Sequence, residues 1–178
     1  MNGITKFFKH LHTINRHRFL VCKYCFKLGL VWQGLTHDLS KYSFTEFWPS
    51  VKNFQGYRSP NEMEREKYGY SKAWLHHKGR NKHHFEYWSD FSKEVMNYVP
   101  VKMPIKYVKE MMCDRIAASK VYLKKKYNDS SALDYLTSHK DGLKMHQDTM
   151  KLITGWLEML AQKGEKETFK YVRKVKDY

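Results

Sequence analysis

The chain has 178 residues, of which 42% are hydrophobic and 16% aromatic. This length and composition exclude an intrinsically disordered polymer and suit one globular domain with a sizeable core. The formal net charge of +15 favours partners that carry phosphate, either a small nucleotide or a nucleic acid, although a merely lysine-rich surface is the alternative reading.

The N-terminal segment has the pattern of a long amphipathic helix. Apolar residues recur at three- and four-residue steps from Ile4 to Leu28 and predict one buried face. Cys22 and Cys25 lie inside this pattern, so their C-x-x-C spacing is interpreted as core packing rather than as a redox or zinc pair. With Cys113 they make an odd set of cysteines, which indicates a reducing compartment.

Shorter helices are predicted in the middle of the chain. Ser43 and Glu46 have the spacing of a capping box, and Pro49 is expected to break or restart the helix that follows. Ser71 is expected to cap one helical turn. Asn81 is expected to cap a further helix that carries a pair of histidines.

Two long helices are predicted in the C-terminal half. Pro104 suits the first position of a helix that runs to about Lys125. A last long helix is expected from Leu143 to Leu160. No run alternates with a period of two between hairpin turns, so strands are not expected.

These elements predict an all-α protein, with one helical bundle over residues 1–162 and a basic C-terminal tail or helix over residues 163–178. Basic residues interrupt each apolar run near the N-terminus, so neither a signal peptide nor a membrane-spanning helix is expected. We therefore expect a cytoplasmic protein without a membrane partner. Its surplus of aromatic residues leaves room for a dimer.

Several histidines and aspartates are candidates for chemistry. His17 lies near the buried stripe of the first helix, but His10 has the same wheel position two turns earlier, so periodicity does not choose between them. His37-Asp38 offers an imidazole next to a carboxylate, a donor set that suits divalent transition metals, and a carboxylate can bridge two of them. Asp114 lies near the packed face of its helix, where it needs an arginine or a metal ion as its partner.

Four of the ten histidines form two closely spaced pairs, His76-His77 and His83-His84. Gly79 between them allows the chain to turn, so one member of each pair is expected to face a common point. A surface-exposed basic segment is the alternative, although the neighbouring aromatic residues should anchor the segment in the core. A His-Asn-His nuclease finger is set aside, because it needs a hairpin and a longer separation.

The ordered set of these residues resembles the HD-domain superfamily of metal-dependent phosphohydrolases. The phrases that carry the resemblance are His17-Arg-Phe-Leu-Val21, His37-Asp-Leu-Ser-Lys41 and Asp114-x-x-Ala-Ala. The segments that begin at His37 and at Trp74 (HDLSKYS and WLHHKGRNKHH) also resemble a small uncharacterised bacterial and phage family, for which no reaction is known.

The superfamily resemblance implies an HD-domain-like helical bundle that holds one or two divalent ions (Mn, Fe, Zn, Ni, Co or Mg). It implies that one ion is held by His17, His37, Asp38 and Asp114. It implies that a second ion is held by one of His76 or His77 and one of His83 or His84, with Asp38 as the bridge.

Further roles follow from charge and from the resemblance. Lys41, Arg80 and Arg18 are candidates to bind substrate phosphate. Glu86 is expected to orient a ligating histidine or to act as a general acid or base beside Asp38. The expected function is hydrolysis of a phosphomonoester or phosphodiester in a phosphorylated small molecule that resembles a nucleotide.

Two other functions stay open. One is a non-catalytic, metal-stabilised protein that binds nucleic acid through its basic surface and exposed tyrosines. The other is chemistry in which the metal activates oxygen.

Overall fold

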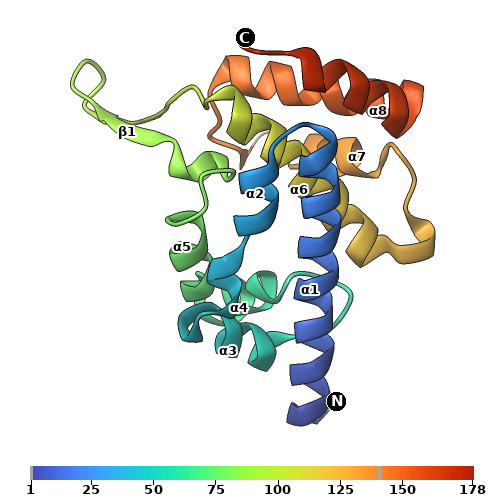
Figure 1. Cartoon of the computed structure of the whole chain (residues 1–178). Coiled ribbons are helices and arrows are strands. Elements are labelled where there is room, and N and C mark those ends of the chain that lie inside the picture. Colours follow the sequence, from blue (N-terminus) through green and yellow to red (C-terminus); the bar gives the residue numbers. More distant parts are fainter. Residues whose placement is uncertain (1, 140–141) are drawn as a thin grey trace.

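The computed structural model describes residues 2–139 and 142–178, and most of these residues are helical (Figure 1). The α-helices are α1 (Gly3–Lys27), α2 (Val31–Thr36), α3 (Phe44–Asn53), α4 (Pro60–Tyr68), α5 (Lys72–Lys78), α6 (Ile105–Leu123), α7 (Ser131–Ser138) and α8 (Gln147–Lys174). Three 3-10 helices, η1 (Leu39–Tyr42), η2 (Phe85–Tyr87) and η3 (Lys124–Lys126), and two strands, β1 (Ser89–Ser92) and β2 (Asn97–Pro100), complete the described elements. The prediction of a largely helical fold is confirmed. In the described part of the chain, no helix combines the length and the apolar character that crossing a bilayer requires.

Helix α1 confirms the long amphipathic helix at the N-terminus. The side chain of Asn2 caps it by accepting a hydrogen bond from the backbone nitrogen of Thr5. After α1, Gly29 has φ 77°, a left-handed conformation that glycine adopts without steric strain, and the chain turns into α2. The buried face of α1, which includes Ile14 and Val21, packs mainly against α6 and α2.

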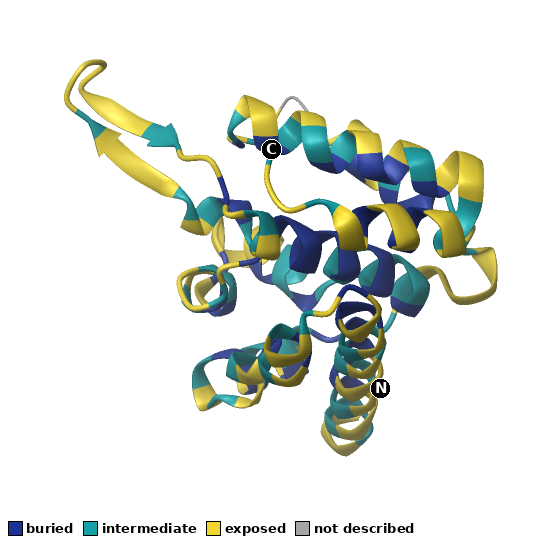
Figure 2. Cartoon of the chain, turned by 45° about the horizontal axis from the view of Figure 1, so that its top comes forward, coloured by how far each residue is buried: buried dark blue, intermediate teal, exposed yellow. Residues whose placement is uncertain are grey.

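The main hydrophobic core lies between α1, α6 and α8 (Figure 2). Helix α6 begins directly after Pro104 and contributes the fully buried Met112 to this core, and α8 contributes the fully buried Ile153. Cys25 and Cys113 lie in this core as free thiols. A second, smaller cluster packs α3 against the N-terminal half of α1 and consists of Ile14, Phe47 and Val51.

The prediction that Pro49 breaks a helix is wrong, because α3 runs through it. Phe47 and Val51 are buried on either side of the proline, and the free energy gained by their burial offsets the loss of the backbone hydrogen bond that proline cannot make. Ser43 occupies the N-cap position as expected, but it makes no side-chain capping bond. The capping box does not form, because the carboxylate of Glu46 contacts histidines instead.

Asn81 does not cap a helix, and the single 3-10 turn η2 replaces the helix predicted after it. Its side-chain amide donates hydrogen bonds of 2.8 Å to Ser40 Oγ and to the backbone oxygen of His77. The amide therefore ties the loop after α5 to η1. The predicted cap of α5 is confirmed, since Ser71 Oγ accepts a hydrogen bond of 3.0 Å from the backbone nitrogen of Trp74.

The expectation of an all-α chain without strands is wrong for residues 89–100. Strands β1 and β2 form an antiparallel hairpin that projects from the helical body (Figure 1). Phe91 lies opposite Tyr98, and their ring centroids are 5.8 Å apart. Because both faces of the hairpin are largely exposed, neither strand requires the alternation that marks a half-buried strand.

The last helix extends well beyond the predicted end. Gly164, with φ 73° and ψ 175°, interrupts the helical backbone of α8, and the helix then continues to Lys174. Phe169 and Val172 belong to the main core, so this part of the chain packs on the body. The hydroxyl of Tyr178 donates a hydrogen bond of 2.6 Å to the backbone oxygen of Met103.

Candidate metal centre

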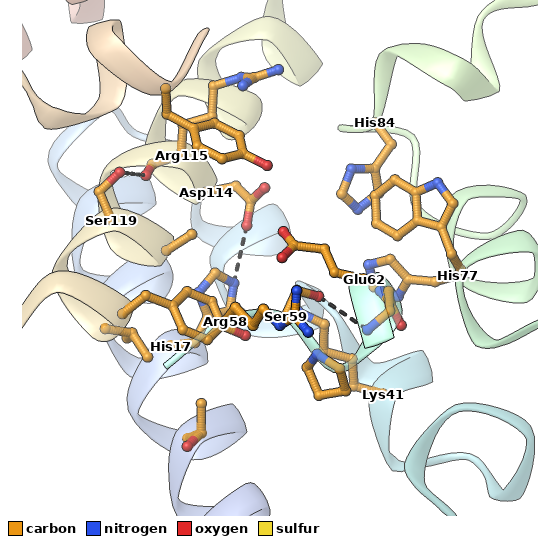
Figure 3. Close-up of a pocket in the computed structure, with 18 of the residues that line it drawn as sticks. His17, Lys41, Arg58, Ser59, Glu62, His77, His84, Asp114, Arg115 and Ser119 are labelled. Atoms are coloured by element: carbon orange, nitrogen blue, oxygen red, sulfur yellow. Dashed lines mark hydrogen bonds and ion pairs between the residues drawn. The ribbon is translucent and has the colours of Figure 1, made fainter. Parts of the chain in front are cut away.

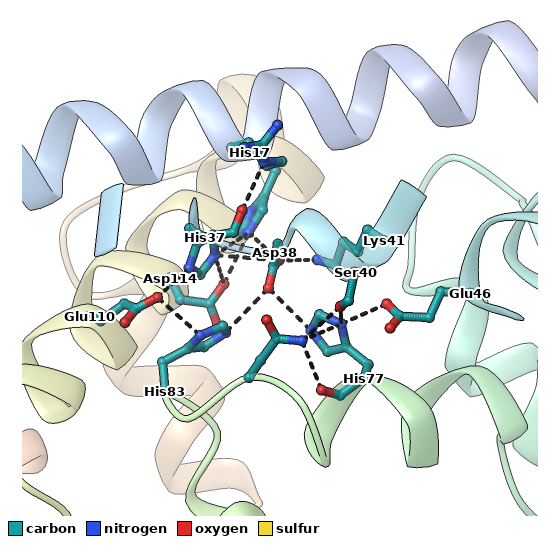
Figure 4. Close-up of polar contacts among 12 residues, drawn as sticks. His17, His37, Asp38, Ser40, Lys41, Glu46, His77, His83, Glu110 and Asp114 are labelled. Atoms are coloured by element: carbon teal, nitrogen blue, oxygen red, sulfur yellow. Dashed lines mark hydrogen bonds and ion pairs between the residues drawn. The ribbon is translucent and has the colours of Figure 1, made fainter. Parts of the chain in front are cut away.

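Asp38 lies at the centre of a buried cluster of imidazoles and carboxylates (Figure 4). It follows α2 in a left-handed backbone conformation, φ 56° and ψ 24°, which few residues other than glycine adopt. The residue is only 1% exposed. Sparsely populated backbone conformations at buried polar residues are frequent in functional sites.

One oxygen of Asp38 faces a first set of donors. Asp38 Oδ2 lies 3.4 Å from His17 Nε2 and 3.3 Å from His37 Nε2. Asp114 Oδ1 is 3.0 Å from the same atom of His17 and 3.6 Å from that of His37. The ligand atoms of these four residues all lie within 4.8 Å of one another. That spacing suits a single ion whose bonds to nitrogen and oxygen are each about 2 Å long.

The other oxygen of Asp38 faces a second set of donors. Asp38 Oδ1 lies 3.2 Å from His77 Nε2 and 3.4 Å from His83 Nε2. His84 completes this set, again within 4.8 Å. The two oxygens of one carboxylate therefore serve two different sets of histidines, which is the arrangement of a carboxylate that bridges two ions.

Packing between distant elements brings these residues together. His17 on α1 meets Asp114 on α6 because these two helices pack along the main core. His77 lies in the last turn of α5, and the side chain of Asn81 holds the loop that carries His83. Figure 4 shows the helices and this loop converging on Asp38.

Two glutamates support the histidines from behind. Glu110 Oε1 lies 2.8 Å from His37 Nδ1 and 3.2 Å from His83 Nδ1, and Glu46 Oε2 lies 2.7 Å from His77 Nδ1. A carboxylate at Nδ1 keeps the proton of a neutral imidazole on that nitrogen. The lone pair of Nε2 then points toward Asp38, in the orientation that a metal ligand needs.

Sequence reasoning did not assign either glutamate to the site. A signal exists for Glu110, which precedes Asp114 by one helical turn and therefore shares its face of α6. Glu46 comes from a separate helix, and its local pattern indicated a capping role instead. Its contacts with histidines from α5 depend on tertiary packing alone.

The structure also separates the members of the histidine pairs. His76 Nδ1 lies 2.6 Å from Glu46 Oε1, and His76 belongs to neither donor set, whereas His77 faces Asp38. His83 and His84 both belong to the second set. The expectation that only one member of each pair faces the common point holds for the first pair alone.

The charges in the cluster keep its carboxylates ionised. Burial raises the pKa of Asp38, but the charges of His37, Lys41 and His77 together hold it well below its usual range. Burial also raises the pKa of Asp114, but hydrogen bonds with two histidines hold it well below its usual range. Lys41 Nζ lies 2.6 Å from Asp38 Oδ2. The buried carboxylates therefore attract positive charge, either protonated imidazole or a metal ion.

Several buried ligand atoms of the cluster lack a hydrogen-bond partner, which is compatible with binding of a divalent ion. Asp38 Oδ1 and Nε2 of His83 and of His84 are buried and form no hydrogen bond within the described residues, whereas Asp38 Oδ2 has Lys41 as its ion-pair partner. Burial and neighbouring imidazoles lower the pKa of both histidines, which favours their neutral, metal-binding form. Buried polar atoms without partners are rare, and here they converge on the places where ions would bind.

A cavity of about 650 Å³ opens beside this cluster (Figure 3). His17 and Asp114 line one side of it, while His77 and His84 line the other. Its volume lies in the range of about 300–1000 Å³ that is typical of small-molecule sites. The cavity therefore gives a bound molecule access to ligands from both donor sets.

Two arginines predicted to bind phosphate are placed elsewhere. Arg18 Nε donates a hydrogen bond of 2.8 Å to the backbone oxygen of His37, and Arg18 Nη2 donates one of 3.1 Å to that of Leu35. Arg80 is exposed, and its hydrogen bond to the backbone oxygen of His76 is 3.4 Å long. Neither arginine lines the cavity. The position of Arg18 on its helix did not indicate these hydrogen bonds to the backbone around the end of α2.

Lys41 and Glu86 do line the cavity. The predicted role of Glu86 in orienting a histidine is wrong, because it forms no hydrogen bond or ion pair with a described histidine and the two glutamates above fill that role. Burial raises the pKa of Glu86, and the charge of Arg115 opposes this increase.

His10 is packed in the cavity wall and is not part of the cluster. Its ring centroid lies 5.4 Å from that of Phe47 and 5.4 Å from that of Phe54, and neither ring nitrogen has a hydrogen-bond partner in the described chain. Burial and the charge of Lys41 lower its pKa to about 4. Of the two histidines with equivalent helix positions, His17 is the one that joins the donors.

Residues 6–159 match the model of a family whose description is "Family of unknown function (DUF5662)". The matched range contains every residue of both donor sets and the two glutamates behind them. No curated protein and no solved structure was found to match the chain. Because the match covers most of the chain, the protein belongs to the DUF5662 family.

Proposed function

We propose that this protein is a divalent-metal-dependent phosphohydrolase with an HD-domain-like bundle, acting on a phosphomonoester or phosphodiester of a nucleotide-like substrate. The observation that supports this most directly is the position of Asp38, with one carboxylate oxygen toward each of two sets of histidines. Sites that hold two ions about 3.5–4 Å apart are common among enzymes that cleave phosphate esters. The resemblance of the ordered residues to the HD-domain superfamily points to the same reaction.

The chain supplies two sets of ligands that share one carboxylate. One set is His17, His37, Asp38 and Asp114, and the other is Asp38, His77, His83 and His84. When bound, divalent ions lower the pKa of water and polarise phosphoryl oxygens. Glu110 and Glu46 lie at Nδ1 of three of the histidines, and in a neutral imidazole a carboxylate at this position favours the tautomer whose Nε2 is available to a metal ion.

Lys41 is the residue best placed to bind a phosphate oxygen. Its ammonium group contacts Asp38 and also lines the cavity. An ammonium carries three donors, so the contact with one carboxylate oxygen leaves others for a substrate. Arg58 and Arg65 line the same cavity and make it favourable for an anion.

Metal analysis and an activity screen test this function together. We expect purified wild-type protein to contain divalent metal and Asp38→Ala to contain almost none. In a screen of nucleotides and generic phosphate esters with each candidate metal, we expect wild type to release phosphate and His37→Ala to be inactive. Negligible metal in both wild type and Asp38→Ala, or activity that His37→Ala leaves unchanged, contradicts the proposal.

A second candidate function rests on a basic groove along the C-terminal part of α8. Its cationic lining consists of Lys27, Lys166, Lys170, Arg173, Lys174 and Lys176. Such a groove suits a polyanion, and a non-catalytic nucleic-acid-binding protein is the function it favours. In a gel-shift titration against salt, tight binding with a steep salt dependence and no phosphate release supports this candidate.

Iron in anaerobically purified protein, together with no hydrolysis of phosphate esters, points instead to chemistry in which the metal activates oxygen.

A further inference from the structure

Glu86 and Arg115 form a pair of oppositely charged groups that the proposed hydrolysis does not use. Both line the cavity beside the metal centre. Glu86 Oε2 and Arg115 Nε are buried, and neither atom has a hydrogen-bond partner in the described chain. Each charge acts on the other, yet the two side chains do not form an ion pair within the described residues.

Leaving these groups unpaired is unfavourable for the folded protein. Both residues are half-buried, and each loses hydration at its one buried atom, where the loss is recovered only by a hydrogen bond or by a partner charge. A ligand that offers donors to Glu86 and acceptors to Arg115 restores both kinds of contact. The two residues are therefore suited to a molecule that carries hydrogen-bond donors and hydrogen-bond acceptors close together.

The pair lies next to both donor sets. Arg115 follows Asp114 directly on α6, and Glu86 follows His84 by two residues. In Figure 3, Arg115 lies beyond Asp114, on the side away from His17. A substrate with its phosphate at the metal centre can therefore extend its other end toward Glu86 and Arg115.

Aromatic side chains line the same part of the cavity. Trp74 lines the wall and packs edge to face against His84, with ring centroids 4.7 Å apart. Tyr135 also lines the cavity and is close enough to Glu86 and Arg115 for their charges to influence its pKa. Flat aromatic faces are the surfaces on which planar heterocycles stack in proteins.

We propose that Glu86 and Arg115 form a base-recognition subsite and that the substrate is a purine nucleotide with a guanine-type edge. A carboxylate can accept two adjacent N–H donors, and a guanidinium can donate to neighbouring acceptors. Guanine presents both, with paired N–H groups on one edge and O6 and N7 as acceptors for arginine. Adenine and cytosine each offer only one amino group as a donor. The inference relies on the proposed function for the position of the phosphate.

Binding of nucleosides tests the subsite without any hydrolysis, because a nucleoside has no phosphate to release. Guanosine, adenosine and cytidine are titrated into the full-length protein by calorimetry, with ribose 5-phosphate as the probe for the phosphate end. We expect guanosine to bind most tightly. Glu86→Gln and Arg115→Gln should each weaken guanosine binding by about 10–100-fold, which is the effect of losing a hydrogen bond to a charged group. Ribose 5-phosphate should bind both variants as it binds wild type.

Matched controls separate recognition from folding. Glu62 lines the same cavity, but none of its atoms is both buried and without a hydrogen-bond partner, and Arg80 is exposed and does not line the cavity. Glu62→Gln and Arg80→Gln should therefore leave guanosine binding unchanged. Glu86→Gln should unfold at about the same temperature as wild type, because the amide keeps the shape of the side chain and Glu86 forms no ion pair with a described residue that the change would break. Equal affinity for the three nucleosides, or guanosine binding that neither Glu86→Gln nor Arg115→Gln weakens, overturns the inference.

The two proposals fail in different ways. If wild type hydrolyses phosphate esters with no preference among bases, the proposed function stands and the base subsite is wrong. If guanosine binding depends on Glu86 and Arg115 but no phosphate ester is cleaved, the subsite stands and hydrolysis is wrong.

Discussion

Glu110 Oε1 lies 2.8 Å from Nδ1 of His37, and the same oxygen lies 3.2 Å from Nδ1 of His83. These two histidines belong to different donor sets around Asp38. One buried carboxylate therefore lies behind one imidazole of each set, and the two sets share this support as well as the carboxylate of Asp38.

Substitution of Glu110 should weaken metal binding at both sets. In Glu110→Gln, the amide does not carry the negative charge that holds the proton on both Nδ1 atoms, so we expect metal affinity to fall by about 10–100-fold. Competition against a colorimetric chelator measures this affinity. Glu158→Gln, an exposed change on α8, is the matched control and should bind metal as wild type does. Wild-type affinity in Glu110→Gln would show that Glu110 does not support the ligands.

The two donor sets should lose metal independently. His17 belongs only to the first set and His77 only to the second, whereas Asp38 belongs to both. We therefore expect His17→Ala and His77→Ala each to retain one ion and Asp38→Ala to retain none. Elemental analysis after gel filtration gives the metal content per chain. If His17→Ala and His77→Ala both lose all metal, the donors form a single site.

Arg18 and Arg80 should differ in their contribution to stability. Arg18 is half-buried and hydrogen-bonds two backbone oxygens of the segment before Asp38, so Arg18→Ala should lower the free energy of unfolding by about 1–3 kcal/mol. Arg80 is exposed, and Arg80→Ala should change it by no more than about 0.5 kcal/mol. Urea denaturation measures both values. Similar stability of the two variants would contradict the supporting role of Arg18.

His10 should make the fold less stable in mildly acidic solution. Its pKa is about 4 in the folded protein, against 6.5 when unperturbed, so the unfolded chain binds a proton that the folded chain excludes. This contribution is absent above pH 6.5 and grows as the pH falls, reaching about 3 kcal/mol of destabilisation near pH 4.

A comparison of His10→Phe with wild type isolates this effect. The phenyl ring retains the packing between Phe47 and Phe54 but cannot be protonated. The variant should therefore gain stability relative to wild type between pH 7 and pH 5, as followed by thermal unfolding. His12→Phe, at an exposed position of the same helix, should show no such gain. A stability difference between His10→Phe and wild type that does not change with pH would refute this account.

Features that depend on local sequence were predicted well. The spacing of apolar residues in α1 and the hydroxyl of Ser71 before α5 act within a few residues, so the predicted helix and cap both form. The sequence failed where local signals were weak or were overridden. Strands β1 and β2 have two exposed faces and thus no alternation, and burial around Pro49 keeps α3 intact.

The sequence indicated which types of residue form the candidate centre, but it did not indicate how their side chains are arranged in space. By itself the sequence determined that His17, the His37-Asp38 doublet and Asp114 lie on helices or next to them, because periodicity and spacing are local properties. Helix periodicity left His10 and His17 equivalent, and only the family resemblance pointed to His17. The tertiary structure places His17 against Asp38, because the position depends on where α6 crosses α1.

The same reason applies to the remaining assignments. His77 faces Asp38 while His76 turns to Glu46, and this difference arises from packing of α5 against α3. Glu110 contacts His37 because the end of α2, which is far from Glu110 in the sequence, packs beside it in the fold. Contacts between residues far apart in the chain depend on how whole elements pack, and the local pattern of a sequence does not contain that information.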